Sequence, residues 1–453
     1  MWKKGISATL KQSIGKGQRL NRIKLTTTKG ELGIQHNVLK LDEQLFRCYG
    51  TKYNRVYAWG INGNGNLGIN KTTKEMPETV LPLAINPKAF ENKKVIKVVS
   101  GVFSEHAFAI TEDGSLYGWG NNMNYQLGIG DIENALGPIK IDIPPVVDVS
   151  CGGTYSAAIT ENGDVYTWGT NAQPIFFWST KGAGPLGVNE IAELKKPRRL
   201  KKFTDATPVQ ISCGKRHAAV VTSNHEVYLW GQGAWGRLGN GGNQSWKEPH
   251  VLVHEIESDI MQVSCGAKHT HFLTSENKVY SCGKNDQKQL GTEESTAGLA
   301  GGNNFDMKTT PSLIDIPTQV RIRYKEDPES EDIPEILLGK VQASGRWGAA
   351  VIVNGEGELL RWGSPQSQPM IMDLPTNVKD FAIGRNHGLY VSPDNELFNL
   401  GRPSNSMLNL SPSPTGLPIR GQVLGVSAGH NMSFALVEHD SDDQELQDLS
   451  KYK

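Results

Sequence analysis

The sequence predicts an all-β fold, a seven-bladed β-propeller closed by pairing N- and C-terminal half-blades. Three observations predict it. One phrase recurs along the 453 residues, the apolar runs inside it are short and joined by turn residues, and the two ends of the chain carry complementary halves of it. The 50 glycines, which follow no collagen period, suit a fold with many tight turns.

The recurring phrase joins a β-branched run, a Ser-Gly or Cys-Gly pair, a His or aromatic residue, a small-residue strand, a turn and Val-Tyr-x-Trp-Gly. It covers residues 98–120, 149–169, 211–231, 263–283, 343–363 and 382–401. The two marker glycines lie 17 residues apart from Gly152 to Gly169 and 18 apart from Gly345 to Gly363. A unit repeated in such constant register is typical of propeller blades or solenoid turns.

Each unit is expected to hold several antiparallel strands. Runs such as Ala-Ala-Ile-Thr and Val-Tyr-Thr-Trp are short, apolar and aromatic, as strands are. Between them stand Asp113-Gly114, Asn162-Gly163 and Asn395-Glu396. Residues of these types tolerate the positive φ of hairpin turns, so they predict the points where the strands reverse.

The chain ends distinguish a closed ring from an open solenoid. Residues 54–68 carry the second half of the phrase alone, and residues 421–437 carry the first half alone. Two such halves complete one blade, whereas a solenoid needs capping units. Closure also removes the edge strands that invite aggregation. Six whole units and one composite unit therefore predict seven blades.

Taken together, Val-Tyr-x-Trp-Gly, the following Asn-x-x-x-x-Leu-Gly and the preceding Cys-Gly-x-x-His resemble the regulator of chromosome condensation repeat, over roughly residues 56–437. The resemblance implies the propeller fold. It leaves function open, because the family includes exchange factors, photoreceptors, ubiquitin-ligase parts and mitochondrial assembly factors. The basic start followed by Arg47-Cys-Tyr-Gly50 and the first Val-Tyr-Ala-Trp-Gly looks most like the mitochondrial branch.

Two functions follow from the resemblance as expectations. One is a non-enzymatic scaffold that assists mitochondrial assembly, of ribosomes or respiratory complexes, by docking protein or RNA partners. The other is guanine-nucleotide exchange on a small Ran-like GTPase. A propeller face can favour the nucleotide-free GTPase without a catalytic residue in the ordinary sense. Exchange factors of the family carry a wedge in the third blade, where this chain has an extra loop over residues 173–184 with different residues.

The recurring histidines and cysteines have a structural and a functional interpretation. His106, His217, His269, His387 and His430 could ring a channel as ligands, yet one His per blade spreads them too widely for a metal site. We expect each imidazole to bond to a neighbouring blade's backbone. The cysteines before the marker glycines, Cys151, Cys213 and Cys265, are expected to be buried apolar packing rather than nucleophiles. The tryptophans of the Trp-Gly pairs are expected to fill the core, with Cys282 and Leu400 in their place in two units.

Residues 63–68 match the Gly-x-Gly-x-x-Gly pattern of dinucleotide-binding loops. That function needs a following helix, and residues 70–77 show no helical period. The same place in other units is also a turn, so the match is attributed to the repeat.

The candidate partner-binding residues cluster in the third unit. They are an aromatic loop and a basic run: Phe176, Phe177, Trp178, Lys181, Lys195, Lys196, Arg198, Arg199, Lys201 and Lys202. Exposed aromatics beside basic residues can stack bases and contact phosphates, or grip a protein. The run over 195–202 also suits a nuclear localisation signal. The alternative is that it is an exposed connection between blades 3 and 4.

Charge and composition set the domain limits. Residues 1–30 hold eight Lys or Arg and no acid, and Trp2, Ile6, Leu10 and Ile14 fall on one helical face. We expect a basic leader over 1–35, a mitochondrial transit peptide in one interpretation and an arm contacting chromatin or RNA in the other. The propeller then spans 36–440, with insertions at 173–184 and 292–334, before an acidic tail over 441–453. Location is expected in mitochondria, in the matrix or at the inner membrane, with the nucleus as the alternative.

The sequence carries no enzyme signature. It has no Gly-x-Ser-x-Gly elbow, no His-Glu-x-x-His and no Walker loop. We therefore expect no catalytic residue, no metal site and no cofactor. An odd number of cysteines, five, without a Cys-x-x-Cys pair favours a reducing compartment. The partner is expected to be an assembly complex or a small GTPase, with RNA as a further partner through 195–202, and the propeller is expected to be monomeric and without a membrane span.

Overall fold

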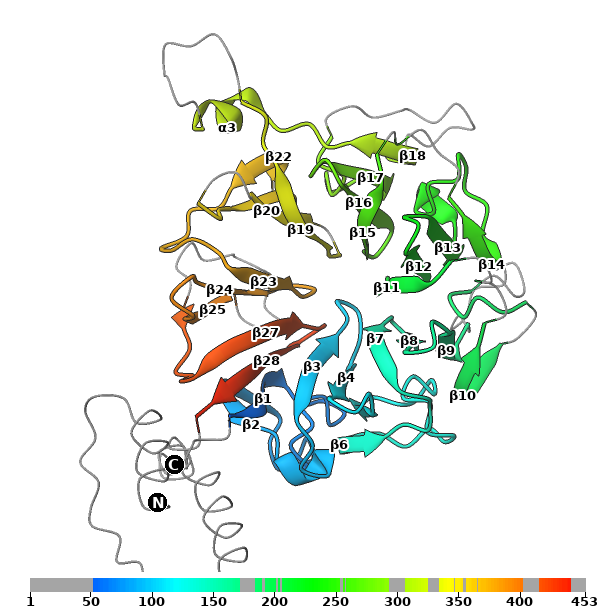
Figure 1. Ribbon diagram of the computed structural model, residues 1–453, viewed down its shortest axis with the longest axis vertical. Helices are drawn as coiled ribbons and strands as arrows, with labels where there is room; N and C mark the ends of the chain where they lie inside the picture. The colour runs from blue at the N-terminus through cyan, green and yellow to red at the C-terminus, as the bar shows by residue number, and fades with distance from the viewer. Residues whose placement is uncertain are drawn as a thin grey trace, which may run out of the picture. The chain divides into compact units, whose positions relative to one another are not determined.

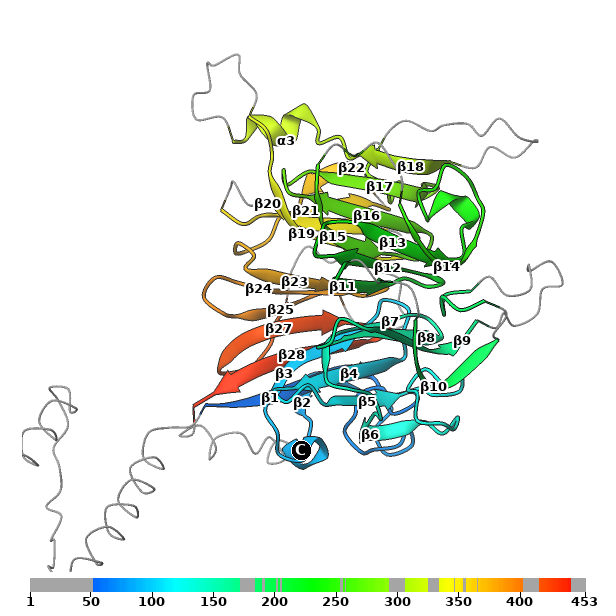
Figure 2. The ribbon, with the colours of Figure 1, turned by 45° about the vertical axis from the view of Figure 1, so that its right-hand side comes forward.

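Seven antiparallel sheets of four strands each surround a central channel (Figure 1). A computed structural model describes residues 52–171, 184–189, 192–200, 203, 206–252, 256, 258–292, 306–324, 334–345, 347–352, 356–364, 366–401 and 415–440. Each sheet is one blade, and in the next view successive sheets lie face to face (Figure 2). The predicted seven-bladed all-β propeller is confirmed.

The blades are numbered from the composite one, and each is given from its innermost strand outward. Blade 1 holds β27 (Gln422–Ala428), β28 (Met432–His439), β1 (Tyr53–Ile61) and β2 (Glu78–Ala84). Blades 2 and 3 hold β3 (Val95–Ser100), β4 (His106–Thr111), β5 (Leu116–Gly120), β6 (Ala135–Lys140), and then β7 (Val146–Cys151), β8 (Tyr155–Thr160), β9 (Val165–Thr170), β10 (Glu193–Arg199).

The remaining four blades follow the same order. Blades 4 and 5 hold β11 (Pro208–Cys213), β12 (His217–Thr222), β13 (Val227–Gly231), β14 (Trp246–Val251), and then β15 (Ile260–Cys265), β16 (His269–Thr274), β17 (Val279–Lys284), β18 (Met307–Leu313). Blades 6 and 7 hold β19 (Leu338–Ala343), β20 (Trp347–Ile352), β21 (Leu359–Gly363), β22 (Gln366–Ile371), and then β23 (Asp380–Ile383), β24 (Gly388–Val391), β25 (Leu397–Leu400), β26 (Thr415–Gly416). Short helical turns are η1 (Pro87–Phe90), η2 (Ala234–Gly236) and α3 (Thr318–Ile322).

Blade 1 closes the ring as the half-units predict. Strand β1 pairs with β28 in antiparallel register from Tyr53 opposite His439 to Gly60 opposite Met432. The hydroxyl of Tyr57 lies 3.2 Å from His439 Nε2 in the buried interior of this sheet. Closure therefore rests on a full run of strand pairing as well as on packing.

The Trp-Gly and Leu-Gly elements of the repeat meet between blades. The indole N–H groups of Trp119, Trp168, Trp230 and Trp362 each donate to a backbone carbonyl in a loop of the preceding blade, at 2.8–3.1 Å. The Leu-Gly glycine of that loop lies against the same indole. A Cβ on Gly68 would stand 2.8 Å from Trp119. The Gly63–Gly68 stretch is therefore a blade-packing turn, as its recurrence predicts.

The two units that lack the Trp of the Trp-Gly pair fill its place in the core in different ways. In blade 5 the Cys282 thiol takes the place of the indole and lies 3.7 Å from the carbonyl of Arg237. In blade 7, Leu400 belongs to the same core cluster as Trp347, which stands where blade 4 has His217. The large indole of Trp347 in blade 6 thus lies in the same cluster as the smaller Leu400 of blade 7.

The innermost strands are joined around the channel by side chains that mimic backbone pairing. The Gln262 amide donates to the Val341 carbonyl at 3.1 Å and accepts from its N–H at 3.0 Å. Gln210 does the same with Val263. The hydroxyls of Ser150, Ser212, Ser264 and Ser427 accept an N–H of the adjacent blade at 2.8–2.9 Å. These contacts satisfy backbone groups that adjacent sheets leave unpaired.

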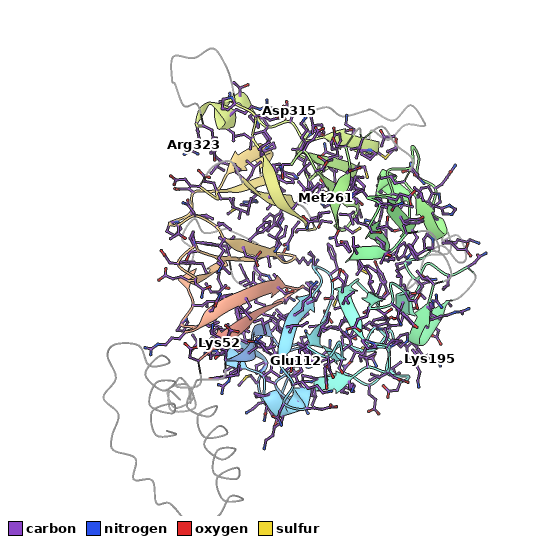
Figure 3. The ribbon with its side chains drawn as sticks, viewed as in Figure 1. Lys52, Glu112, Lys195, Met261, Asp315 and Arg323 are labelled. Atoms are coloured by element: carbon purple, nitrogen blue, oxygen red, sulfur yellow. The ribbon has the colours of Figure 1, made fainter. Side chains whose placement is uncertain are left out.

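Two stretches differ from expectation. The run at Lys195 is not a connection between blades: residues Glu193–Arg199 form β10, the outermost strand of blade 3. Figure 3 shows Lys195 at the outer edge of the ring. The 292–334 stretch contains β18, which pairs with β17 as the fourth strand of blade 5, and α3. In the part of the chain that is described, no helix is long and apolar enough to span a membrane.

Candidate partner-binding face

Seven loops surround one mouth of the channel. They join the first and second strands of each blade and are called the mouth loops: residues 101–105, 152–154, 214–216, 266–268, 344–346, 384–387 and 429–431. Neighbouring loops are linked by backbone hydrogen bonds, from Lys215 to Gly266 and from Ala267 to Ser344, each at 3.1 Å. Further bonds run from Arg385 to Gly429 at 3.2 Å and from His430 to Ser104 at 3.3 Å. These bonds join four of the seven pairs of neighbouring loops, and the loops together are called the rim.

The channel behind this rim is narrow and polar. It encloses a cavity of about 180 Å³, lined by the serines and glutamines that join the innermost strands. Phe103 of blade 2 reaches across the mouth, because a Cβ on Gly345 of blade 6 would lie 3.4 Å from its ring. The Nζ of Lys215 lies 5.7 Å from the centre of the same ring.

Four of the five recurring histidines, His106, His217, His269 and His387, lie at the base of the mouth loops and are fully buried. Nε2 of His106 lies 2.8 Å from the Ser156 hydroxyl, and Nε2 of His387 lies 2.9 Å from the Ser433 hydroxyl. Burial lowers the pKa of His106 to about 3 and that of His387 to about 4. The predicted structural role is confirmed for these residues. Their partner in the next blade is chiefly a hydroxyl rather than the expected backbone, although His387 also contacts the Met432 carbonyl.

His430 does not occupy the repeated position. The bond from the Gly429 N–H to the Met432 carbonyl matches the one from Gly214 to His217, so Met432 is the equivalent residue. His430 lies instead in the mouth loop, in contact with Arg385 and 3.6 Å from Glu105. The prediction was wrong here because His430 directly follows the marker glycine, Gly429. The equivalent residue, Met432, stands three positions after that glycine, as His217 does after Gly214.

A similar shift applies to blade 6. There the Ser344 N–H bonds to the Trp347 carbonyl, so Ser344 rather than Gly345 stands at the marker position. His269 of blade 5 faces this unit, and its two ring nitrogens have no hydrogen-bond partner among the described residues. The reason is that blade 6 carries Gly348 at the strand position where blade 5 offers the Thr270 hydroxyl to His217.

The cysteines are packing residues, as expected. Cys151, Cys213, Cys265 and Cys282 are free thiols in the buried core. Burial raises the pKa of Cys213 to about 12 and raises those of the other three. Thiols held protonated in this way are poor nucleophiles. Among the described residues, no three His, Cys, Asp or Glu side chains gather as a metal site would require.

The mouth loops carry a cluster of cations, here called the mouth cations: Lys215, Arg216, Lys268 and Arg385. Lys215 and Arg385 are exposed, and the other two are half-buried. Burial, followed by the charges of Arg216, Arg385 and Arg237, lowers the pKa of Lys215. Burial, followed by the Lys284 charge, also lowers the pKa of Lys268. These groups therefore repel one another across blades 4, 5 and 7.

A buried guanidinium adds to this charge. Arg237, in the loop after η2, is 2% exposed and donates to the carbonyls of Ala234 and Ala267 at 2.9 and 3.2 Å. Burial and the Arg216 charge lower its pKa to about 9. The bond to the Ala267 carbonyl holds the mouth loop of blade 5 from below. Both acceptors are neutral carbonyls, so neither of them compensates the positive charge of the guanidinium.

The predicted basic residues lie elsewhere. Lys195 Nζ stands 5.1 Å above the Tyr125 ring, and Arg199 forms an ion pair with Asp164 at 2.7 Å. Lys196 and Arg198 are exposed on the same strand. Charges and Pro197 on an outermost strand are a usual protection against edge-to-edge pairing. Lys195, Lys196, Arg198 and Arg199 thus share one edge and do not meet the mouth cations.

Phe176, Phe177, Trp178, Lys181, Lys201 and Lys202 lie outside the described residues. The loop that carries the aromatics starts after β9, and the Thr170 N–H bonds to the Thr154 carbonyl of a mouth loop at 3.0 Å. Its base is therefore at the mouth-loop end of blade 3.

The sequence contained a signal for the mouth cations. A basic residue stands between the marker glycine and the buried aromatic or His in Gly214-Lys-Arg-His217, Gly266-Ala-Lys-His269 and Gly384-Arg-Asn-His387. Lys215 and Arg385 directly follow the marker glycine, whereas Lys268 stands two positions after it. Because the basic residue is not at one fixed position, comparing the identical residues of the units does not reveal it. The mouth cations become apparent only when the exposed residues of each unit are compared, rather than the recurring buried ones.

Comparisons with known proteins agree with this architecture. Regulator of chromosome condensation (RCC1) repeats match residues 53–110, 113–159 and 224–273, and a second RCC1 repeat description matches 95–126, 146–173, 209–236 and 260–289. The ultraviolet-B receptor UVR8 of Arabidopsis thaliana is 33% identical over 245 residues, 54% of this chain and 52% of the receptor. The human E3 ubiquitin-protein ligase HERC2 is 30% identical over 237 residues, 52% of this chain and 5% of the ligase. The chain thus spans about half, or far less, of these curated relatives.

Solved structures show the same fold. Prp20p of Saccharomyces cerevisiae superposes with a TM-score of 0.68 at 20% identity, covering 88% of this chain and 94% of that one. Human WBSCR16 superposes with a TM-score of 0.66 at 19% identity, covering 85% and 98%. The repeat matches and the seven four-stranded sheets lead to one conclusion: the chain belongs to the RCC1-repeat family of β-propellers.

Proposed function

We propose that this propeller is a non-enzymatic scaffold whose mouth-loop face docks a protein partner. The observation that carries the proposal is the cluster of mouth cations, which is exposed or half-buried and has no ion-pair partner among the described residues. Unpaired charges that repel one another cost stability, so a structural role does not account for them. The histidines and cysteines beneath, by contrast, are buried and take part in packing between the blades.

Relatives support a docking role. Prp20p has binding properties toward Gsp1p and histones, and yeast RCC1 (Prp20) has been solved bound to Kap60. This chain shares the fold of that protein-binding protein at 19–20% identity, which supports a docking role for it.

The docking face is testable by site-specific photo-crosslinking. A benzophenone amino acid replaces Asn386 in a mouth loop or, as the control, exposed Lys140 on β6. We expect a defined protein adduct in cells from position 386 and none from position 140. Equal adducts from both positions, or an adduct from 140 alone, would place docking elsewhere and contradict the proposal.

We further propose that the scaffold acts in mitochondria, in assembly of a ribosomal or respiratory complex. The support is the basic leader over residues 1–35, whose first 30 residues hold eight Lys or Arg and no acid; it lies outside the described residues. The test is imaging of a C-terminally tagged chain together with sequencing of its mature N-terminus. Mitochondrial signal with the leader removed is the expected result, and nuclear signal with an intact leader would contradict it.

Guanine-nucleotide exchange is the second candidate. The observation that favours it is the extra blade-3 loop, whose base is joined to the mouth loop at Thr154, together with the binding of Prp20p to Gsp1p. A wedge on this face should accelerate release of a fluorescent GDP analogue from a small GTPase. Deletion of residues 173–183 should abolish that acceleration, and an unchanged release rate with the intact chain argues for docking alone.

A further inference from the structure

The mouth cations lack the acids that would neutralise them. Glu105 is the one acidic residue of the described mouth-loop positions, and its carboxylate already accepts from Asn64 and Asn121 at 3.1 and 3.0 Å. Its other near neighbour is His430. Asp286 pairs with Lys284. The Asp286 charge also acts on Lys268, but its effect is smaller than those of burial, Lys284 and Arg237. The rim from blade 4 to blade 7 therefore presents an excess of positive charge.

Two aromatic rings lie within this field, and cations already cover them. Lys215 stands over Phe103, as described above. Trp235 has Lys268 and Lys284 over its ring, at 5.5 and 4.9 Å from the ring centre. The π electrons of each ring attract the ammonium groups that lie over it and hold them in place. They are not free to stack nucleobases, which is how exposed aromatics bind single-stranded nucleic acids.

The shape of the cluster also restricts the ligand. The cations converge on one channel mouth instead of following a line across the surface, as a groove that tracks a nucleic-acid backbone does. The channel cavity of about 180 Å³ is smaller than the usual small-molecule pocket of roughly 300–1,000 Å³. A ligand must therefore sit on the rim and direct single charged groups toward it.

We propose that the channel mouth binds an acidic polypeptide segment, rich in Asp and Glu, through Lys215, Arg216, Lys268 and Arg385. This proposal rests on the docking function above and names the chemistry of the partner. Carboxylates suit both kinds of cation, since guanidinium groups take them in paired hydrogen bonds and ammonium groups as point charges. Half-buried Arg216 and Lys268 gain most, because a charge removed from water interacts more strongly with its partner.

The test uses the full-length chain and a fluorescein-labelled peptide of about ten alternating Asp and Glu residues, followed by anisotropy. The variant is Lys215→Glu/Arg385→Glu. The control, Lys88→Glu/Lys140→Glu, makes the same change in charge at exposed lysines of η1 and β6. Both variants keep the basic stretches 1–30 and 195–202, so the difference between them reports the mouth alone. Circular dichroism checks that both fold.

We expect the mouth variant to bind the peptide at least about tenfold more weakly than the control variant, and the control to stay within about twofold of the parent. Raising the salt from about 0.05 M to about 0.5 M should weaken binding by the parent, because screening acts on exposed charges. A uridine oligonucleotide of equal length should bind less tightly than the peptide. Equal loss in both variants, tighter binding of the oligonucleotide, or no peptide binding would each overturn the proposal.

The result separates this proposal from the docking function. If photo-crosslinking from position 386 succeeds and the acidic peptide does not bind, the face docks a partner of another chemistry. If both fail, the docking function falls together with the proposal.

Discussion

The Nε2 atom of His217 lies 2.9 Å from the hydroxyl of Thr270, across the boundary between blades 4 and 5. That hydroxyl donates its own proton to the carbonyl of Arg237 at 2.7 Å. The hydroxyl must therefore accept from His217, so the imidazole carries its proton on Nε2. The same arrangement joins His106, Ser156 and the Gln126 carbonyl between blades 2 and 3. A relay of three groups thus connects each of these blade pairs.

Breaking this relay should destabilise the ring. Thr270→Val leaves a buried imidazole N–H without an acceptor, which should lower the free energy of unfolding by about 1–3 kcal/mol. Chemical denaturation measures the change. Thr270→Ser retains the hydroxyl and should lose less. In a double-mutant cycle with His217→Phe, the losses should be less than additive, and full additivity would show that the two side chains are not coupled.

Stability should fall as the solution becomes acidic. The folded pKa values of His106, His271 and His387 are lowered to about 3, 4 and 4 from an ordinary 6.5. Between those values and 6.5 the unfolded chain binds protons that the folded chain does not, so unfolding gains as pH drops. Each histidine contributes roughly 1.4 kcal/mol per pH unit in that window, and nothing above it.

Denaturation at several pH values between about 4 and 7 checks the sign and the slope, within the window set by these pKa shifts. His387→Gln removes one of the titrating groups. The slope of the unfolding free energy against pH should therefore fall by the contribution of one proton, about 1.4 kcal/mol per pH unit. Stability that rises on acidification, or an unchanged slope in the variant, would mean that these imidazoles are charged in the folded chain.

The glutamines of the innermost strands should matter more than their exposed neighbours. Gln262→Leu removes two hydrogen bonds to Val341 and leaves that residue's backbone groups unpaired, so the unfolding free energy should drop by about 1–3 kcal/mol. Met261→Ala is the control, because Met261 is adjacent and 50% exposed. Its effect should stay within about 0.5 kcal/mol. Similar losses in both would indicate general sensitivity of β15.

Packing of the Leu-Gly turn can be separated from backbone conformation. Gly128 has φ of +74°, and a Cβ there would lie 2.8 Å from Trp168. Gly241 has φ of +80° and no atom within 4 Å of such a Cβ. Gly241→Ala should cost about 1–2 kcal/mol through backbone conformation alone. Gly128→Ala should cost clearly more, as thermal or chemical denaturation would show, and equal costs would mean that Trp168 adapts freely.

The fold was predictable because its signal is repeated. The Trp-Gly and Leu-Gly elements recur since each blade must contact the next in the same way, and the half-units at 54–68 and 421–437 disclose the closure. His430 and Gly345 were assigned wrongly at the points where a unit departs from the common spacing. Lys195 seemed to lie in a connection because charges and Pro197 hide the pattern of an outermost strand.

The mouth cations were not predicted, for the opposite reason. Lys215, Lys268 and Arg385 come from three blades and lie about 170 residues apart in sequence at most. Only ring closure brings them to one rim. Their charge is not conspicuous in any single unit, whereas the run at 195–202 is conspicuous in sequence and lies on an edge strand in the fold. A functional cluster built from different blades leaves only a weak signal in each unit, here one or two basic residues after the marker glycine.

The pairing of β1 with β28 also determines when the protein can finish folding. Tyr57 and His439 meet across 382 positions of sequence, so the ribosome synthesises all the other blades before the strand that completes blade 1. Until then β1 keeps an unpaired edge, the kind of surface that joins other chains and that chaperones shield. A nascent chain, or one that terminates before β28, therefore lacks the partner of β1, and we expect this vulnerability to end with the synthesis of β28.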